Sequence, residues 1–266
     1  MGCLLLIGCK KSEKPDGEVN TAAGFAFTSA EFVKISESVL RSYLVTPFVL
    51  RNGSTSCDSL SLVAGDTLPG SVRSYTRAAA GSKCGIADNT LRSGMIKVSQ
   101  IGRINAPGNK LIIKISDYTK SLGADSYTFS CDSIVLSEVR QENNQWRYQL
   151  NVVNGKGKDA QSLMPLAFSA TVTLLEREVS LLLSGSGTSR DGKKYTFRQD
   201  TDPVYKASDC EHFTVGKVAI LPESAAPRYI DFGNGGCDFE ADVYYTDLTA
   251  SNTDMQEINR IRIELK

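Results

Sequence analysis

The stretch at residues 228–242, RYIDFGNGGCDFEAD, has the form of a β-hairpin. Residues 229–232 predict a short strand, residues 233–236 a turn, and Cys237 the opening of the next strand. Glycine and asparagine adopt positive φ angles at little cost, so such a cluster turns the chain sharply. The segment therefore predicts antiparallel β-structure near the C-terminus.

The hairpin also holds one member of a repeated cysteine spacing. Cys237 follows Cys210 by 27 residues (237 − 210), and Cys84 follows Cys57 by 27 residues (84 − 57). In both cases the second cysteine follows a glycine-containing turn and precedes an alternating strand. The spacing predicts one β-unit used twice, with disulfides joining Cys57 to Cys84 and Cys210 to Cys237. Pairing of Cys131 with Cys57 or Cys84 stays open, because connectivity cannot be deduced from spacing.

Strand patterns continue through most of the chain. Residues 145–153 alternate most cleanly, and we expect their apolar face, which holds Trp146 and Tyr148, to be core. Clusters of Asn, Asp and Gly separate the apolar runs and predict tight turns. The other strand candidates are 95–101, 110–118, 133–140, 167–175, 179–184, 195–199, 213–221, 237–245 and 258–265, and the turn clusters are 105–109, 154–157 and 190–193. Together they predict a mainly β fold of antiparallel sheets, packed as a sandwich or curled towards a barrel.

One helix is expected before the strands, at residues 28–44. Thr28 and Glu31 can form a capping box, and apolar residues after them recur at helical spacing. The preceding residues are polar and contain proline and glycine, which predicts a flexible tether. The expected order is a signal-peptide remnant at 1–8, a lipidated tether at 9–27, the helix at 28–44, a first β-unit at 45–140 and a second at 141–266.

The N-terminus predicts an export signal. Leu6-Ile7-Gly8-Cys9 matches a bacterial lipobox, in which the signal peptidase cuts before the cysteine and the thiol carries a lipid. The apolar run before Cys9 is shorter than the usual signal-peptide core of about 7–15 residues and has no basic residues before it, so we expect the true start to lie upstream. No later stretch reaches the apolar length of a membrane helix. The expectation is a cell-envelope lipoprotein held by lipid at Cys9 on the outer membrane, at its periplasmic or surface face.

Composition excludes some partners. Of 266 residues, 30 are Lys or Arg and 30 are Asp or Glu, so the net charge is zero. A nucleic-acid binder usually has a basic excess, so no nucleic-acid partner is expected. The apolar fraction of 41% and the charged fraction of 23% are ordinary for a globular protein.

No residue set predicts catalysis, a metal or a cofactor. His212 is the only histidine, and no Gly-x-Ser-x-Gly motif accompanies it, so we expect a packed or surface role. The cysteines lack the close pairs of a zinc site. Residues 187–194 resemble a phosphate-binding loop but lie between two strand patterns, which predicts a hairpin turn. Asp231 and Asp238 flank the glycine turn without the calcium-loop pattern.

The lipobox and two cysteine turns resemble an uncharacterised family of Bacteroidota envelope lipoproteins. Tyr229-Ile-Asp-Phe-Gly-Asn-Gly-Gly-Cys-Asp238 is similar to the family's IDFGxGxCD turn, with one extra glycine. Arg92, Ser93 and Gly94 match the family's RSG after its first cysteine turn, although the DFG before that turn is missing here. The resemblance implies an all-β exported lipoprotein and implies no catalytic residues.

The expected function is that of a lipid-anchored, non-enzymatic β scaffold with a binding or assembly role. The alternatives are an envelope enzyme acting on glycans through two carboxylates, and a module that binds a carbohydrate or a protein through exposed aromatic side chains. Trp146 and Tyr148 are the aromatic candidates for that module, although their strand face is expected to be core. The partner class, glycan or protein, is left open by the sequence.

Overall fold

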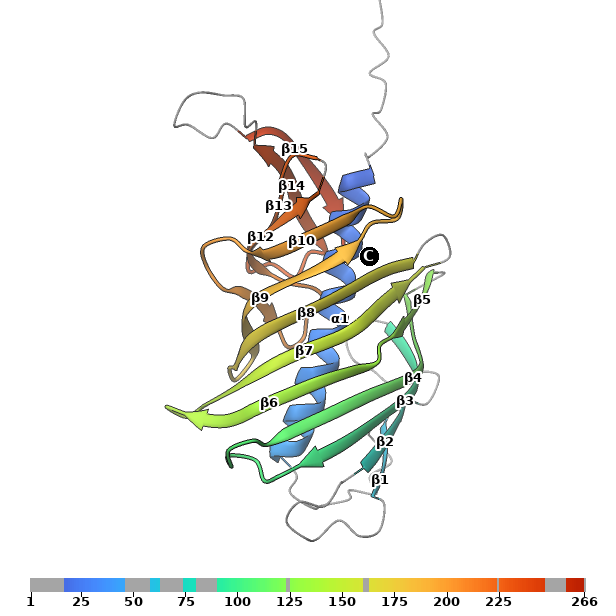
Figure 1. The fold of residues 1–266 in the computed structure, drawn as a ribbon, viewed down its shortest axis with the longest axis vertical. Helices are drawn as coiled ribbons and strands as arrows, with labels where there is room; N and C mark the ends of the chain where they lie inside the picture. The colour runs from blue at the N-terminus through green and yellow to red at the C-terminus, as the bar shows by residue number, and fades with distance from the viewer. Residues whose placement is uncertain are drawn as a thin grey trace, which may run out of the picture.

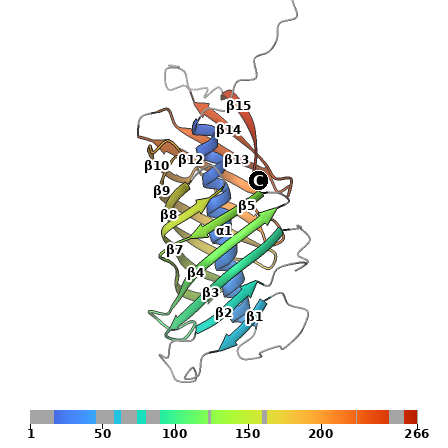
Figure 2. The same ribbon diagram turned by 90° about the vertical axis from the view of Figure 1, so that its right-hand side faces the viewer.

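The chain forms a large curled antiparallel sheet with one long helix along its concave face, as Figures 1 and 2 show. This computed structural model describes residues 17–45, 58–62, 74–79, 90–122, 125–159, 163–223, 225–246 and 257–265. Its elements are α1 (Gly17–Val45), β1 (Asp58–Leu62), β2 (Ser74–Ala79), β3 (Thr90–Ile101), β4 (Lys110–Leu122), β5 (Asp125–Ser130), β6 (Ser133–Glu142), β7 (Gln145–Lys158), β8 (Leu163–Leu174), β9 (Glu178–Thr188), β10 (Lys194–Gln199), β11 (Val204–Ala207), β12 (Val215–Pro222), β13 (Arg228–Asn234), β14 (Glu240–Thr246) and β15 (Glu257–Glu264). The mainly β prediction is confirmed, in its curled rather than its sandwich form.

Strand order follows the sequence almost throughout. The path runs β1-β2-β3-β4-β5-β7-β8-β9-β10-β12-β13-β14-β15, while β6 pairs with β4 and β7, and β11 pairs with β9 and β12. The sheet does not close on itself, and its two ends are β1 and β15. Because neighbours in sequence are neighbours in space, simple hairpins build nearly the whole sheet.

The described strands form one continuous sheet across the predicted boundary between two β-units. The predicted boundary between Arg140 and Gln141 falls inside β6, and β6 and β7 continue the same sheet. One apolar cluster joins residues of α1, β3, β7 and β14, and α1 contacts β6, β7, β8, β13 and β15. The described strands on both sides of the predicted boundary therefore share one sheet and one apolar core.

The helix is longer than predicted. It begins at Gly17, so the second part of the predicted tether at 9–27 is helical. Val19, Ala22 and Phe25 are buried and extend the packing face by more than two turns. Gly24 reads as a helix breaker in sequence, yet a Cβ there would overlap the Met164 side chain of β8. This glycine is explained by close packing of helix against sheet rather than by flexibility.

The glycines at 154–157 are also explained by close packing and do not form the predicted turn. They lie inside β7, where a Cβ on Gly155 would lie 2.8 Å from the Phe32 ring and a Cβ on Gly157 would overlap Thr28. Glycine within a strand often marks such an approach of two elements. The predicted turns at 105–109 and 190–193 are confirmed, since they connect β3 to β4 and β9 to β10.

Bulges curl the sheet around the helix. Asp117, Glu138 and Asn154 have positive φ angles of 51°, 54° and 50°, and each lies where the pairing register shifts. At each site two residues face one on the neighbouring strand, which bends the strand and increases its twist. The alternation predicted for β7 is confirmed up to its bulge: Tyr148 is buried and Trp146 is half-buried against the core.

The hairpin predicted at residues 228–242 is present. β13 pairs with β14 from Arg228 opposite Tyr245 to Asp231 opposite Asp242. Gly233 and Gly235 have positive φ angles, as the turn requires. The second strand begins at Glu240, so Cys237 lies in the connection rather than at the start of a strand.

Candidate functional site

Four charged side chains form a stripe along one face of α1. Glu31, Lys34, Glu37 and Arg41 lie three, three and four residues apart, so they share one face of α1. Such a stripe normally faces water, yet Glu31, Lys34 and Glu37 are buried. Charged groups are rarely buried unless they are paired. We call these four residues, together with Lys120, Lys206 and Glu211, the buried charge cluster.

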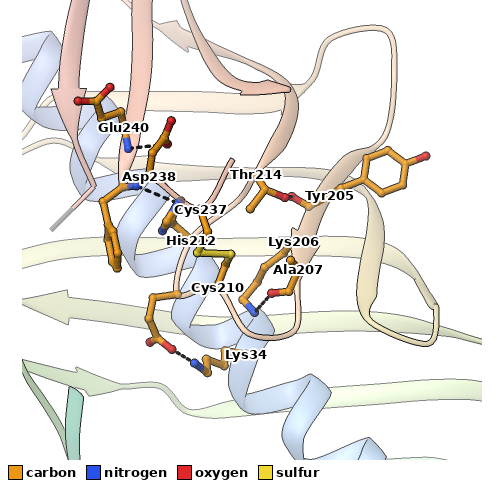
Figure 3. Close-up of a disulfide and its surroundings, with 12 residues drawn as sticks. Lys34, Tyr205, Lys206, Ala207, Cys210, His212, Thr214, Cys237, Asp238 and Glu240 are labelled. Carbon is orange, nitrogen blue, oxygen red and sulfur yellow. Dashed lines mark hydrogen bonds and ion pairs between the residues drawn. A yellow bond between two sulfur atoms is a disulfide. The ribbon is translucent and has the colours of Figure 1, made fainter. Parts of the chain in front are cut away.

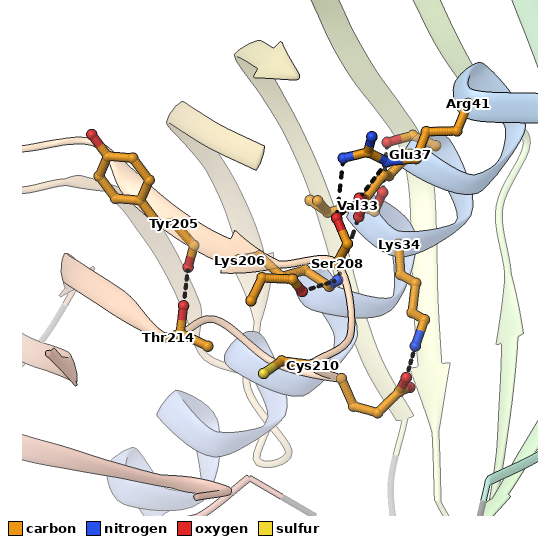
Figure 4. Close-up of polar contacts among 12 residues, drawn as sticks. Val33, Lys34, Glu37, Arg41, Tyr205, Lys206, Ser208, Cys210 and Thr214 are labelled. Carbon is orange, nitrogen blue, oxygen red and sulfur yellow. Dashed lines mark hydrogen bonds and ion pairs between the residues drawn. The ribbon is translucent and has the colours of Figure 1, made fainter. Parts of the chain in front are cut away.

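Lys120 of β4 joins two carboxylates in the first half of the cluster. Its Nζ lies 3.0 Å from Glu31 Oε2 and 2.9 Å from Glu211 Oε2. The hydroxyl of Tyr118 donates a hydrogen bond of 2.8 Å to the other oxygen of Glu31. Lys34 forms an ion pair with Glu211, shown in Figures 3 and 4. Two ammonium groups and two carboxylates thus meet where α1, β4 and the segment before β12 come together.

The β-bulge in β4 is what directs Lys120 inward. Before the bulge, Leu111, Ile113 and Ile115 point to the core, and uninterrupted alternation would continue with residues 117 and 119. The extra residue at Asp117 shifts the phase, so Tyr118 and Lys120 face α1 instead. The cationic end of Lys120 also lies 4.8 Å from the centre of the Phe27 ring.

The second half of the cluster is centred on Glu37. Ser208 donates to Glu37 Oε1 at 2.5 Å, Arg41 Nε lies 2.9 Å from the same oxygen, and Lys206 Nζ lies 3.5 Å from Oε2. Figure 4 shows Arg41 reaching Ser208 as well as Glu37. Burial lowers the pKa of Lys206, while Glu37 and then Glu31 oppose that shift. This carboxylate is thus held by three donors from two elements.

A disulfide fixes the segment that delivers Glu211. Cys210 and Cys237 are bonded with their Cα atoms 5.8 Å apart, within the range that a disulfide requires. The prediction for this pair is confirmed. Cys210 is buried next to Glu211, and Cys237 anchors the loop between β13 and β14, as Figure 3 shows. The bond therefore holds the β11–β12 connection against the hairpin.

His212 is packed beneath the hairpin loop, in agreement with one of the two expected roles. Its Nε2 accepts a hydrogen bond of 3.3 Å from the backbone N–H of Phe239, and the two rings lie 4.7 Å apart. Its Nδ1 is buried and has no hydrogen-bond partner within the described parts of the chain. Burial lowers the pKa of His212 to about 4; Asp238 opposes this shift, and Lys120 and Lys206 add to it. The ring is neutral at pH 7.

The carboxylates around Lys120 are buried. Glu31 and Glu211 are 0% and 5% exposed, although both lie within hydrogen-bond distance of the Lys120 nitrogen. One hollow on the described surface lies on the face away from α1, between β6, β7 and β8, and it holds about one water molecule. It is lined by Glu138, Arg140, Arg147, Tyr148, Gln149 and Thr171. The charges around Lys120 are thus buried, while Arg41 at the edge of the cluster stays partly exposed.

Of the remaining predicted site residues, all are cysteines. Cys9, Cys57 and Cys84 lie outside the described residues. Cys131 is a half-buried free thiol, and burial, with a smaller contribution from Asp132, raises its pKa to about 12. No group of three or more His, Cys, Asp or Glu that could hold a metal occurs in the described ranges.

The two aspartates of the glycine turn have ordinary structural partners. Asp231 pairs with Lys217 at 3.1 Å and accepts a hydrogen bond from the Gly233 N–H at 3.0 Å. Asp238 accepts one from the Glu240 N–H at 3.3 Å. These contacts shape the turn and the start of β14.

Sequence reasoning missed the buried charge cluster. A signal was present, because four charged residues recur at helical spacing within the predicted helix. Their partners Lys120 and Glu211 lie 89 and 177 residues beyond Glu31 and Lys34 (120 − 31, 211 − 34), so no local pattern connects them.

Comparison of the chain with family models, with curated proteins and with solved structures finds no match in any of the three. The helix α1 is not apolar enough along its length to cross a membrane.

Proposed function

We propose that this chain is an exported, lipid-anchored envelope protein whose curled sheet is a non-catalytic scaffold for binding or assembly. One observation carries the proposal: α1 occupies the concave face of the sheet, where a curled sheet would otherwise offer a ligand cavity. Phe25, Phe32 and Leu40 of α1 are fully buried there. A partner would then contact the outer face or the sheet edges.

Two further features support export. The bond between Cys210 and Cys237 suits an oxidising compartment such as the periplasm or the cell surface. Gly17 follows Cys9 by eight residues (17 − 9), a connection that spans at most about 29 Å when fully extended. A lipid at Cys9 would therefore hold the sheet close to the outer membrane, with α1 connecting the lipid to the sheet.

The alternative functions have weaker support. A glycan-active enzyme needs two carboxylates in an accessible cleft, and the pair nearest to that description, Glu31 and Glu211, is buried under α1. A binding module would use exposed aromatic rings, and Trp146 is half-buried against the core while Tyr148 is 1% exposed. A scaffold fits these contacts better.

Lipid attachment is tested by replacing Cys9 with Ala in the full-length protein, with its complete signal peptide. We expect the wild type to incorporate labelled fatty acid and to fractionate with the outer membrane, and C9A to lose both properties. Globomycin, which blocks the lipoprotein signal peptidase, should make the unprocessed precursor accumulate.

The matched control is Cys131→Ala, which removes another unpaired thiol and should leave fractionation unchanged. Membrane fractionation of C9A equal to that of the wild type would overturn the lipid-anchor proposal. For the wild type, protease accessibility in intact cells distinguishes a protein on the cell surface from one on the periplasmic face of the outer membrane.

A further inference from the structure

We propose that Lys34 and Glu211 form an intramolecular amide bond, joining the Lys34 Nζ to the side-chain carbonyl carbon of Glu211. The bond would connect the middle of α1 to the connection between β11 and β12. It would be a covalent modification of the chain made by its own side chains, independent of the lipid at Cys9.

Folding places the two reacting groups in contact. The Lys34 amine and the Glu211 carboxylate are in direct contact, and their side chains are only 11% and 4% exposed. Figure 4 shows the extended lysine pointing at the carboxylate from the facing helix. Two groups fixed in contact react as if at very high concentration, because the entropy of bringing them together has already been lost on folding. The disulfide at Cys210 holds the residue next to Glu211 and strengthens this effect.

The buried site also favours the uncharged forms of Lys34 and Glu211 that the reaction needs. An amine attacks a carboxylic acid only when both groups are uncharged. In water near neutral pH the amine is protonated and the acid is ionised, so the two uncharged forms rarely occur together. Burial disfavours charged forms, and transfer of one proton from Lys34 to Glu211 converts this ion pair into a neutral amine and a neutral acid. Lys120 and Glu31 remain as a balanced ion pair 3.0 Å apart, so the transfer leaves no unpaired charge.

Lys120 is placed to activate the Glu211 carboxyl group. Lys120 Nζ lies 2.9 Å from Glu211 Oε2, the oxygen that becomes negative when the amine adds to the carbon. A cation fixed at that place in a dry site stabilises the developing charge. Lys120 is held there by Glu31, which is in turn fixed by the Tyr118 hydroxyl.

The step balances without another reactant. The Lys34 nitrogen forms a bond to the Glu211 carbon, and the negative charge moves to Oε2 beside Lys120. The nitrogen loses a proton, the bond from carbon to Oε1 breaks, and Oε1 leaves with two protons as water. One amine and one carboxylic acid give one amide and one water, with no change of oxidation state.

The second half of the buried charge cluster gives an internal comparison. Lys206 lies 3.5 Å from Glu37, but Ser208 and Arg41 both hold the other oxygen of Glu37. The Lys206 amine thus lies farther from its carboxylate than Lys34 does from Glu211, so these two groups are less well placed to react. We therefore expect an amide at Lys34 and none at Lys206.

The test is peptide mapping of the purified full chain. After reduction and alkylation, trypsin should release residues 12–41 joined to residues 207–217, lighter by one water than the two peptides together, because modified Lys34 is not cleaved. Fragment ions should place the link at Lys34 and Glu211. Complete recovery of separate peptides 12–34, 35–41 and 207–217 would overturn the proposal and leave an ion pair only.

Two variants test the mechanism. Lys34→Arg keeps the positive charge but should give no joined peptide, whereas a joined peptide in K34R would assign the link to another amine and overturn the proposal. Lys120→Gln should lower the joined fraction severalfold at equal times after synthesis, with an unchanged far-UV circular dichroism spectrum as evidence of folding. A folded K120Q chain that links as fast as the wild type would overturn the role of Lys120.

Discussion

At the scale of single residues, His212 gives the clearest expectation for solution behaviour. Its imidazole is 2% exposed, and its pKa in the folded chain is about 4, against about 6.5 for an exposed histidine. The unfolded chain therefore binds the proton more readily between these values. The free energy of unfolding falls as the pH decreases through this window, since protonation favours the unfolded state.

We predict that His212 contributes up to about 3 kcal/mol to the difference in unfolding free energy between pH 7 and pH 4. Urea unfolding at a series of pH values measures it, with His212→Gln as the comparison, because carboxylates that titrate below pH 5 affect both chains equally. An identical pH dependence in H212Q would contradict the assignment. Titration of the imidazole by NMR should give a midpoint near pH 4.

At the scale of elements, the contact between α1 and β7 depends on the missing side chain of Gly155. A Cβ there would lie 2.8 Å from the Phe32 ring and 2.9 Å from the Leu166 carbonyl oxygen. The backbone of Leu166 is held in the ladder between β8 and its neighbours, so it cannot move aside easily. Helix and strand approach each other closely because no side chain separates them.

We predict that Gly155→Ala lowers the free energy of unfolding by about 1–3 kcal/mol through overpacking. Chemical denaturation monitored by circular dichroism measures the change. Ser169→Ala on the exposed face of β8 is the control, and we expect it to change stability by less than about 0.5 kcal/mol. A loss in G155A no larger than that of the control would show that the interface adapts.

At the scale of the whole molecule, the sheet and α1 form one core. The apolar cluster runs from Ile96 in β3 to Ile263 in β15 through buried residues of the helix. Bulges in β4, β6 and β7 wrap the sheet around α1, and the buried charge cluster adds ion pairs from both ends of the chain. Residues of α1 contact strands from β6 to β15, so loss of the helix contact would expose apolar residues of both regions.

We predict a single cooperative unfolding transition. The fluorescence of Trp146, the only tryptophan, should change at the same denaturant concentration as the far-UV circular dichroism. Phe32→Ala should shift both probes together and cost about 3–5 kcal/mol, because Phe32 is fully buried in the shared core. Two separated transitions, or a shift of one probe alone, would restore the picture of two independent β-units.

Local sequence patterns predicted the β class, the alternation of β7, the hairpin at β13 and β14, and the pairing of Cys210 with Cys237. These features depend on local rules: side chains alternate along a strand, glycine and asparagine permit tight turns, and a hairpin brings nearby cysteines together. Such rules act within about thirty residues, which is also the range of the repeated cysteine spacing.

Three features follow from contacts between distant segments: Lys120 faces inward, the helix starts at Gly17, and the glycines at 154–157 pack against a helix instead of turning the chain. A bulge shifts the phase of a strand by one residue, and its position depends on the neighbouring strand. A buried charge depends on partners that can be far away in sequence, as Glu211 is from Lys34. Burial and pairing of this kind arise from contacts between distant segments, which local sequence patterns do not encode.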